Sequence, residues 1–171
     1  MTAPVATEPP WPAEKLRQLV LSSETETRAL AARFSDVIAP GDILLLSGAL
    51  GTGKTAFARA LIQSRQGTMA DDVPSPTFTL VQTYDAGAIE IWHADLYRLD
   101  GPDDIAELGL LDAAETAVLL VEWPEKAGPI WPDTAMWMRF DMAGQAARQV
   151  GLYGKPASVS AQRLLAGFQV P

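Results

Sequence analysis

The chain has 171 residues, of which 48% are hydrophobic, so it is long enough to bury one sizeable core within one domain. Lys and Arg number 13 against 21 Asp and Glu, and the net charge of −8 disfavours direct binding of a nucleic-acid backbone. Because the chain has no Cys and a single His, disulfides and zinc sites built from thiolates or several imidazoles are excluded, and any metal ion would be held by oxygen atoms.

The first twenty residues are predicted to be a flexible leader, and residues 21–171 a single domain. Residues 1–12 contain four prolines and neither a basic start nor an apolar run, so they do not resemble a secretory signal. No apolar stretch reaches the roughly 18 residues that a membrane-spanning helix needs. We therefore expect no membrane association and a cytoplasmic location.

A helix is predicted over residues 24–38, because Ser23 and Glu26 have the spacing of a capping box and apolar residues then recur at helical intervals. Residues 42–46 form a short apolar run, which is typical of a strand buried on both faces. This strand leads into a glycine-rich loop over residues 47–55, and a second helix is expected after the loop.

The remaining elements predict a mixed sheet. Residues 78–84 and 88–92 favour extended chain on either side of a turn, which indicates an antiparallel hairpin. A short helix follows over 102–109, an apolar strand over 117–121, a loop over 123–132, a half-exposed strand over 136–142, a pairing strand over 149–153, and a helical face over 164–168. The predicted fold class is α/β, a single P-loop NTPase-like domain with a mixed central β-sheet, an antiparallel hairpin and flanking helices.

The glycine-rich loop matches the phosphate-binding pattern G-x-x-x-x-G-K-[ST] in the strand-to-helix context that its mechanism requires. Glycines let the backbone amides turn inward, and the start of the helix adds partial positive charge, so the loop can hold the phosphates of a nucleotide. The predicted phosphate-binding residues are Gly48, Ala49, Leu50, Gly51, Thr52, Gly53, Lys54, Thr55 and Ala56.

Lys54, Asp95 and Glu122 are the candidate catalytic residues. Lys54 is expected to contact the β- and γ-phosphates, and the Thr55 hydroxyl to bind Mg²⁺. Glu122 ends an apolar strand and is the favoured carboxylate ligand of that ion, while Asp95 is an alternative ligand or a group that orients the attacking water. His93 is interpreted as a hydrogen-bonded scaffold group rather than a catalytic base.

ATP is the expected nucleotide, because a chain without Asn cannot contain the Asn-Lys-x-Asp element by which many GTPases bind guanine. Two other functions remain open at this point. A small-molecule kinase would transfer the γ-phosphate to a metabolite, although the scattered arginines and the hairpin weaken that reading. A non-catalytic adaptor would sense the nucleotide without turnover.

Four blocks in this order and spacing resemble the bacterial TsaE (YjeE) family over about residues 21–126. The blocks are Leu50-Gly51-Thr52-Gly53-Lys54-Thr55, Ser75-Pro76-Thr77-Phe78-Thr79-Leu80-Val81 with Tyr84, His93-Ala94-Asp95-Leu96-Tyr97-Arg98-Leu99, and Glu122-Trp123-Pro124-Glu125. The family usually has Asp where this chain has Ala49, and Ala where it has Thr52.

The resemblance implies a Mg-dependent ATPase subunit that acts with TsaB and TsaD in forming N6-threonylcarbamoyladenosine (t6A) in tRNA. ATP hydrolysis would reset the TsaB–TsaD transferase complex, and tRNA would be contacted only indirectly, through that complex. The resemblance also implies that Thr27 lies near the adenine, although Thr25 is close by in the sequence. It further implies that Thr55 and Glu122 bind Mg²⁺ and that Asp95 supports the hydrolytic water. The segment Ser75-Pro76-Thr77 would sense the γ-phosphate.

Overall fold

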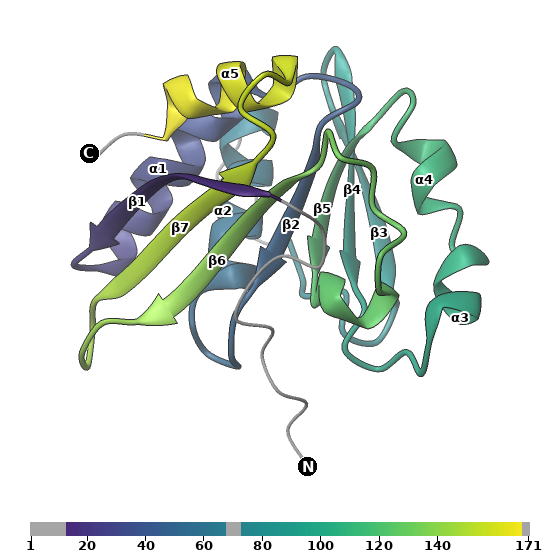
Figure 1. The fold of residues 1–171 in the computed structure, drawn as a ribbon, viewed down its shortest axis with the longest axis horizontal. Coiled ribbons are helices and arrows are strands. Elements are labelled where there is room, and N and C mark those ends of the chain that lie inside the picture. Colours follow the sequence, from purple (N-terminus) through teal and green to yellow (C-terminus); the bar gives the residue numbers. More distant parts are fainter. Residues whose placement is uncertain (1–12, 68–72, 169–171) are drawn as a thin grey trace.

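The structure, a computed structural model, describes residues 13–67 and 73–168 and contains a seven-stranded sheet in the order β1-β7-β6-β2-β5-β4-β3 (Figure 1). The four central strands β6, β2, β5 and β4 are parallel, and antiparallel strands extend the sheet at both edges. The strands are β1 (Glu14–Leu21), β2 (Ile43–Ser47), β3 (Val81–Ala86), β4 (Ile89–Asp95), β5 (Val118–Glu122), β6 (Met136–Met142) and β7 (Arg148–Gly154).

Helices cover both faces of the sheet, and the buried strand β2 supplies side chains to both cores. Leu44 and Leu46 pack with α1 (Glu24–Val37), α2 (Lys54–Gln66) and α5 (Val159–Gly167) on one face. Ile43 and Leu45 pack on the other face with α3 (Pro102–Ala106), α4 (Leu110–Ala113) and the 3₁₀ helix η1 (Pro124–Ala127). This arrangement confirms the α/β class with a mixed sheet, a hairpin and flanking helices.

The start of α1 has the capping predicted from the sequence. The Ser23 hydroxyl accepts from the Glu26 amide at 3.3 Å, and the Glu26 carboxylate accepts from the Ser22 amide at 2.6 Å. These bonds satisfy two N–H groups near the helix end. The prediction of a helix over 24–38 is confirmed to within one residue. Within residues 13–67 and 73–168, no helix combines the length and the apolar character needed to cross a bilayer.

The prediction of a flexible leader over residues 1–20 is wrong for its last seven residues. Glu14–Leu21 form β1, an edge strand that pairs antiparallel with β7. Leu19 and Leu21 are buried, whereas Glu14 and Lys15 are exposed, so the strand is polar at its start. Because an edge strand needs only a few inward apolar side chains, its sequence is too polar to predict a strand here. Residues 1–12 lie outside the described residues.

Two predicted strands differ in detail from the observed ones. The strand expected over 78–84 begins only at Val81, because the Leu80 amide donates to the Pro76 carbonyl in a turn and Leu80 has a φ of 66°. The strand expected to be half-exposed, β6, has both faces covered over its first part. Met136, Trp137 and Met138 are all fully buried, since the two cores lie on opposite sides of this strand.

Also, a turn at Gly109, with a φ of 67°, divides the helix expected over 102–109 from α4. The loop expected over 123–132 contains η1.

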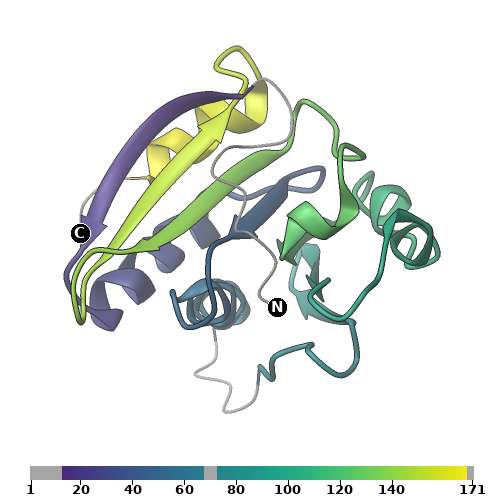
Figure 2. The same ribbon diagram turned by 60° about the horizontal axis from the view of Figure 1, so that its bottom comes forward.

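The ends of the central parallel strands place the polar residues of the sequence blocks together. β2 leads through the glycine-rich loop into α2, which Figure 2 views almost along its axis. In the neighbouring strands, Asp95 at the end of β4 is in register with Glu122 at the end of β5.

Candidate functional site

The loop between β2 and α2 is packed against the C-terminal part of the sheet. Gly48 has a φ of 137°, and a Cβ atom there would lie 2.3 Å from the Phe140 carbonyl oxygen of β6. Only glycine fits this position. Gly53 caps α2 with a φ of 107° and offers no side chain to the helix end. The N–H groups of the first turn are therefore left for a ligand, and their partial positive charge favours an anion.

The Lys54 ammonium lies within this loop. Its Nζ donates to the Gly48 carbonyl at 2.7 Å and to the Ala49 carbonyl at 2.9 Å, and it stands 4.3 Å from the centre of the Trp123 ring. Burial lowers the pKa of Lys54, although the carboxylates of Glu122, Glu125 and Asp95 oppose that change. The backbone carbonyls and the ring hold the ammonium beside the inner surface of the loop.

Thr52, which replaces the usual alanine of the resembled family, closes the loop from inside. Its hydroxyl donates to the Ala49 carbonyl at 2.8 Å, and the residue is only 1% exposed. The Ala49 carbonyl thus accepts from both the Thr52 hydroxyl and the Lys54 ammonium. The threonine thus adds a side-chain bond within the loop that alanine could not make.

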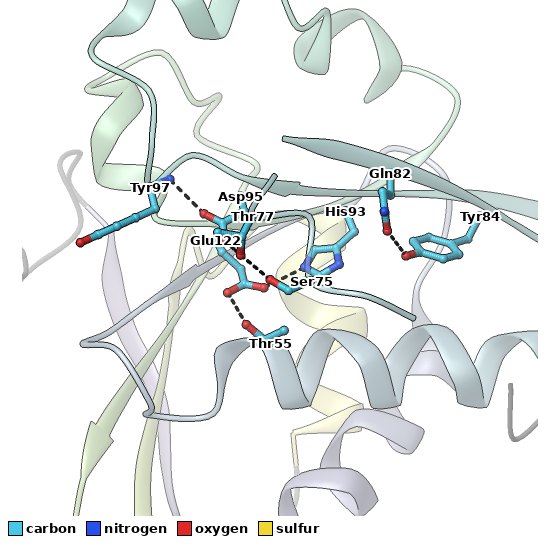
Figure 3. Close-up of polar contacts among 9 residues, drawn as sticks. All are labelled: Thr55, Ser75, Thr77, Gln82, Tyr84, His93, Asp95, Tyr97 and Glu122. Atoms are coloured by element: carbon cyan, nitrogen blue, oxygen red, sulfur yellow. Dashed lines mark hydrogen bonds and ion pairs between the residues drawn. The ribbon is translucent and has the colours of Figure 1, made fainter. Parts of the chain in front are cut away.

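Thr55 and Glu122, the two predicted metal ligands, are in contact (Figure 3). The Thr55 hydroxyl donates to Glu122 Oε2 at 2.7 Å, and the buried His93 ring bonds to Glu122 Oε1 through Nε2 at 2.8 Å. His93 thus holds the carboxylate, as the scaffold interpretation predicts. Hydroxyl and carboxylate oxygens are the hard ligands that Mg²⁺ prefers, so the donor set fits this ion.

Asp95 lies beside this pair and is bonded to the segment around Ser75. Its Oδ1 accepts from the Tyr97 amide at 2.9 Å, and its Oδ2 accepts from the Thr77 hydroxyl at 3.3 Å; the hydroxyls of Ser75 and Thr77 are 2.7 Å apart (Figure 3). Burial raises the pKa of Asp95, and the charge of Glu122 acts in the same direction. The bonds from Tyr97 and Thr77 oppose this change.

These groups surround a cavity of about 350 Å³. It is lined by Leu50, Gly51, Gly53, Lys54, Thr55, Ala56, Ser75, Thr77, Asp95, Glu122 and Trp123. The cavity therefore brings together the three candidate catalytic residues and most of the predicted phosphate-binding residues. The other three residues of the loop do not line this cavity. Gly48 packs against Phe140, and the Thr52 hydroxyl is bonded to the Ala49 carbonyl.

A second cavity, of about 440 Å³, lies on the other side of the loop. Both cavities are lined by Gly51, Gly53 and Ala56, so both border the start of α2. Thr27 lines the second cavity and is 4% exposed, whereas Thr25 is exposed to solvent. The structure thus distinguishes the two threonines and brings Thr27 to the loop.

Sequence reasoning missed one contributor to this site, Arg148 at the start of β7. Its side chain lines the second cavity and donates to the Thr52 carbonyl at 3.0 Å and the Gly51 carbonyl at 3.3 Å. No local pattern marks it, because it follows the loop by almost a hundred residues and lies in a segment without a motif. Trp123, which lines the first cavity, forms a ring pair with Tyr97, with centroids 4.9 Å apart.

A mixed sheet whose central parallel strand β2 leads through a glycine-rich loop to a helix, with lysine and threonine at the helix start, defines a nucleotide-binding protein with a P-loop NTPase-like fold. The family model described as "Threonylcarbamoyl adenosine biosynthesis protein TsaE" matches residues 21–150. The chain therefore belongs to the TsaE family.

Individual relatives agree with this assignment. The tRNA threonylcarbamoyladenosine biosynthesis protein TsaE of Rickettsia felis is 44% identical over 107 residues, which are 63% of this chain and 62% of that protein. The protein of the same name from Aquifex aeolicus is 31% identical over 83% of this chain and 99% of its own length. The crystal structure of YdiB from Bacillus subtilis superposes with a TM-score of 0.70 at 25% identity, covering 90% of this chain and 92% of YdiB.

Proposed function

We propose that the chain binds ATP and hydrolyses it to ADP and phosphate in a Mg²⁺-dependent reaction. The observation that carries this proposal is that two cavities border the phosphate loop. One holds Lys54, Asp95 and Glu122, and the other is bordered by Thr27. Their volumes of about 350 and 440 Å³ suit the triphosphate and the nucleoside, respectively.

The triphosphate is bound mainly by the backbone of the loop. The free amides at the start of α2 point to the phosphates, and Lys54 exchanges its carbonyl partners for phosphate oxygens. This exchange is favourable because an ionised acceptor makes a stronger bond than a carbonyl does.

Binding of the triphosphate depends on a divalent cation. Lys54 lies among the carboxylates of Asp95, Glu122 and Glu125, which repel a bare triphosphate. Thr55 and Glu122 would hold Mg²⁺, the latter oriented by His93. When bound, Mg²⁺ supplies positive charge that offsets the charge of the β- and γ-phosphates.

Asp95 orients the attacking water. Its carboxylate faces the phosphate cavity and is fixed by Tyr97 and Thr77, so its position does not depend on the ligand. Its raised pKa makes it a better proton acceptor than an exposed aspartate once it is ionised. Thr77 links this carboxylate to the Ser75 segment, through which the γ-phosphate is sensed.

Family membership supports a role in forming t6A on tRNA. Relatives in this family are named as tRNA threonylcarbamoyladenosine biosynthesis proteins. We place the chain as the ATPase subunit that resets a TsaB–TsaD transferase complex between turnovers, in the cytoplasm. Its net charge of −8 fits a subunit that leaves tRNA binding to its partners.

The reaction is tested by calorimetry with ATP and by phosphate release, in the presence and absence of TsaB and TsaD. We expect weak turnover alone, faster turnover with the partners, and weaker ATP binding when EDTA removes divalent cations. Lys54→Ala should abolish measurable ATP binding. Asp95→Asn should keep ATP binding and lower turnover by about 100-fold or more, since it removes the group that orients the water.

Asp100→Asn is the matched control, because Asp100 is exposed and does not line the phosphate cavity. Its turnover should equal that of the wild type. Unchanged ATP binding by Lys54→Ala would refute the proposed site. Turnover that is equally fast with and without the partners would refute the role as a subunit, and unchanged turnover by Asp95→Asn would refute the role of that carboxylate.

A further inference from the structure

A guanidinium group from the C-terminal hairpin is bound to the outer side of the phosphate loop. Nε of Arg148 donates to the Thr52 carbonyl at 3.0 Å, and Nη2 donates to the Gly51 carbonyl at 3.3 Å. Nη1 donates to the Ala147 carbonyl at 3.1 Å, which fixes the guanidinium to its own hairpin. The planar group therefore spans two successive carbonyls of the loop, as its rigid arrangement of donors allows.

These two bonds determine where the amides of the loop point. In a trans peptide unit the carbonyl and the N–H point in opposite directions. Since Arg148 binds the Thr52 carbonyl, the Gly53 N–H of the same unit points away from Arg148. The Thr52 N–H shares a unit with the Gly51 carbonyl and donates inward to the Ala49 carbonyl at 3.4 Å. The Thr52 amide is therefore bonded within the loop, and the Gly53 amide is the one of the two that is left for an anion.

The backbone of the loop does not enforce this orientation by itself. Glycines flank Thr52 on both sides, with φ values of 78° at Gly51 and 107° at Gly53. Glycine populates positive and negative φ about equally, so the intervening peptide units can rotate at little cost. A rotated unit would present a carbonyl oxygen to the phosphate and repel it. Bonds within the loop hold the Thr52 side chain and amide, whereas the unit that carries the Gly53 amide is held by Arg148 from outside.

We propose that Arg148 is a positioning residue for the phosphate loop and, by holding the Thr52 carbonyl, keeps the Gly53 amide directed at the triphosphate. This inference rests on the proposed function, because it presupposes that the loop binds ATP. Arg148 acts through the carbonyls of Gly51 and Thr52 and does not itself need to contact a phosphate. The C-terminal hairpin thereby becomes part of the nucleotide site.

The test compares two ligands, ATP and inorganic tripolyphosphate, each with Mg²⁺, by calorimetry on the full chain. Arg148→Gln should weaken the binding of both ligands by the same factor, about tenfold, because tripolyphosphate uses only the loop. Arg148→Lys keeps the charge and can reach one carbonyl, so it should bind both ligands with intermediate affinity. It also serves as the test variant if Arg148→Gln does not fold.

Arg17→Gln is the matched control. Arg17 donates to the carbonyls of Leu165 and Phe168 at 3.5 and 3.0 Å, so the control also removes an arginine that bonds to two carbonyls, but away from the loop. It should leave both affinities unchanged. If Arg148→Gln binds tripolyphosphate as tightly as the wild type does, the inference is overturned. This holds also if the variant binds ATP more weakly, because Arg148 would then contact the base rather than position the loop. If wild-type protein binds no ATP, the proposed function fails instead.

Discussion

The side chains around the phosphate loop combine one cation with several carboxyl groups in a partly buried setting. Burial lowers the pKa of Lys54 and raises the pKa of Asp95 and Glu125. Each of these changes favours the neutral form, which shows that the folded chain bears an electrostatic cost at this site. Residues that lower stability in this way are typical of binding sites, where a ligand supplies the missing charge.

Glu125→Gln is expected to raise the stability of the ligand-free protein at neutral pH. Both Glu125 carboxyl oxygens are buried, and burial raises the pKa above its ordinary value of 4.5 against the opposing charge of Lys54. As the pH rises, the Glu125 carboxyl is deprotonated at a lower pH in the unfolded chain than in the folded chain. The stability of the wild type therefore declines as the pH rises through the folded pKa. Glutamine removes that decline, so the gain should appear at pH 8 and vanish at pH 4.

Thermal unfolding of both proteins at these two pH values measures the effect. Glu115→Gln is the control, because Glu115 is exposed, and its unfolding temperature should follow that of the wild type at both values. A gain from Glu125→Gln that is equally large at pH 4 would contradict the electrostatic explanation. In that case the effect would come from packing of the amide.

Among the elements, those with a local sequence signal were predictable. The cap at Ser23 and the glycine loop before Lys54 depend on residues within a few positions of each other, so the local sequence predicts them. β1 was missed because its place depends on pairing with β7, which lies far along the chain. Arg148 was missed for the same reason, since its bond to Thr52 joins residues 96 positions apart.

Truncating an inward residue of β1 tests whether this strand belongs to the folded domain. Leu21 is fully buried in the core beneath α1 and α5, whereas Val20 on the opposite face is 53% exposed. Leu21→Ala should lower the free energy of unfolding by about 2–5 kcal/mol, because it removes buried methyl groups and leaves a cavity.

Urea unfolding measures this change, and Val20→Ala on the same strand is the control. It should cost much less, since its side chain is already in contact with water. If neither variant loses stability, then residues 14–21 do not contribute to the fold. An equal, substantial loss from both variants would instead contradict the inward position of Leu21 and the outward position of Val20.

At the scale of the whole molecule, the proposed nucleotide site draws on segments from the beginning, middle and end of the chain. α1 supplies Thr27, the central strands supply Asp95 and Glu122, and β7 supplies Arg148. In Figure 2 these segments gather around the start of α2. ATP binding should therefore stabilise the entire domain rather than one subdomain, because ligand binding is linked to folding wherever the unfolded chain has no site.

The net charge of −8 bears on whether the chain itself binds tRNA. Binding of a nucleic-acid backbone relies mainly on Lys and Arg, and a chain with 21 acidic and 13 basic residues repels a polyanion at long range. In a gel-shift assay at about 150 mM salt, near physiological screening, we expect the chain alone to leave tRNA unshifted, with or without ATP. Adding TsaB and TsaD should produce a shifted complex that contains the chain. Shifting of tRNA by the chain alone, weakening steeply as salt rises, would mean that it binds tRNA directly and that its partners do not carry that role.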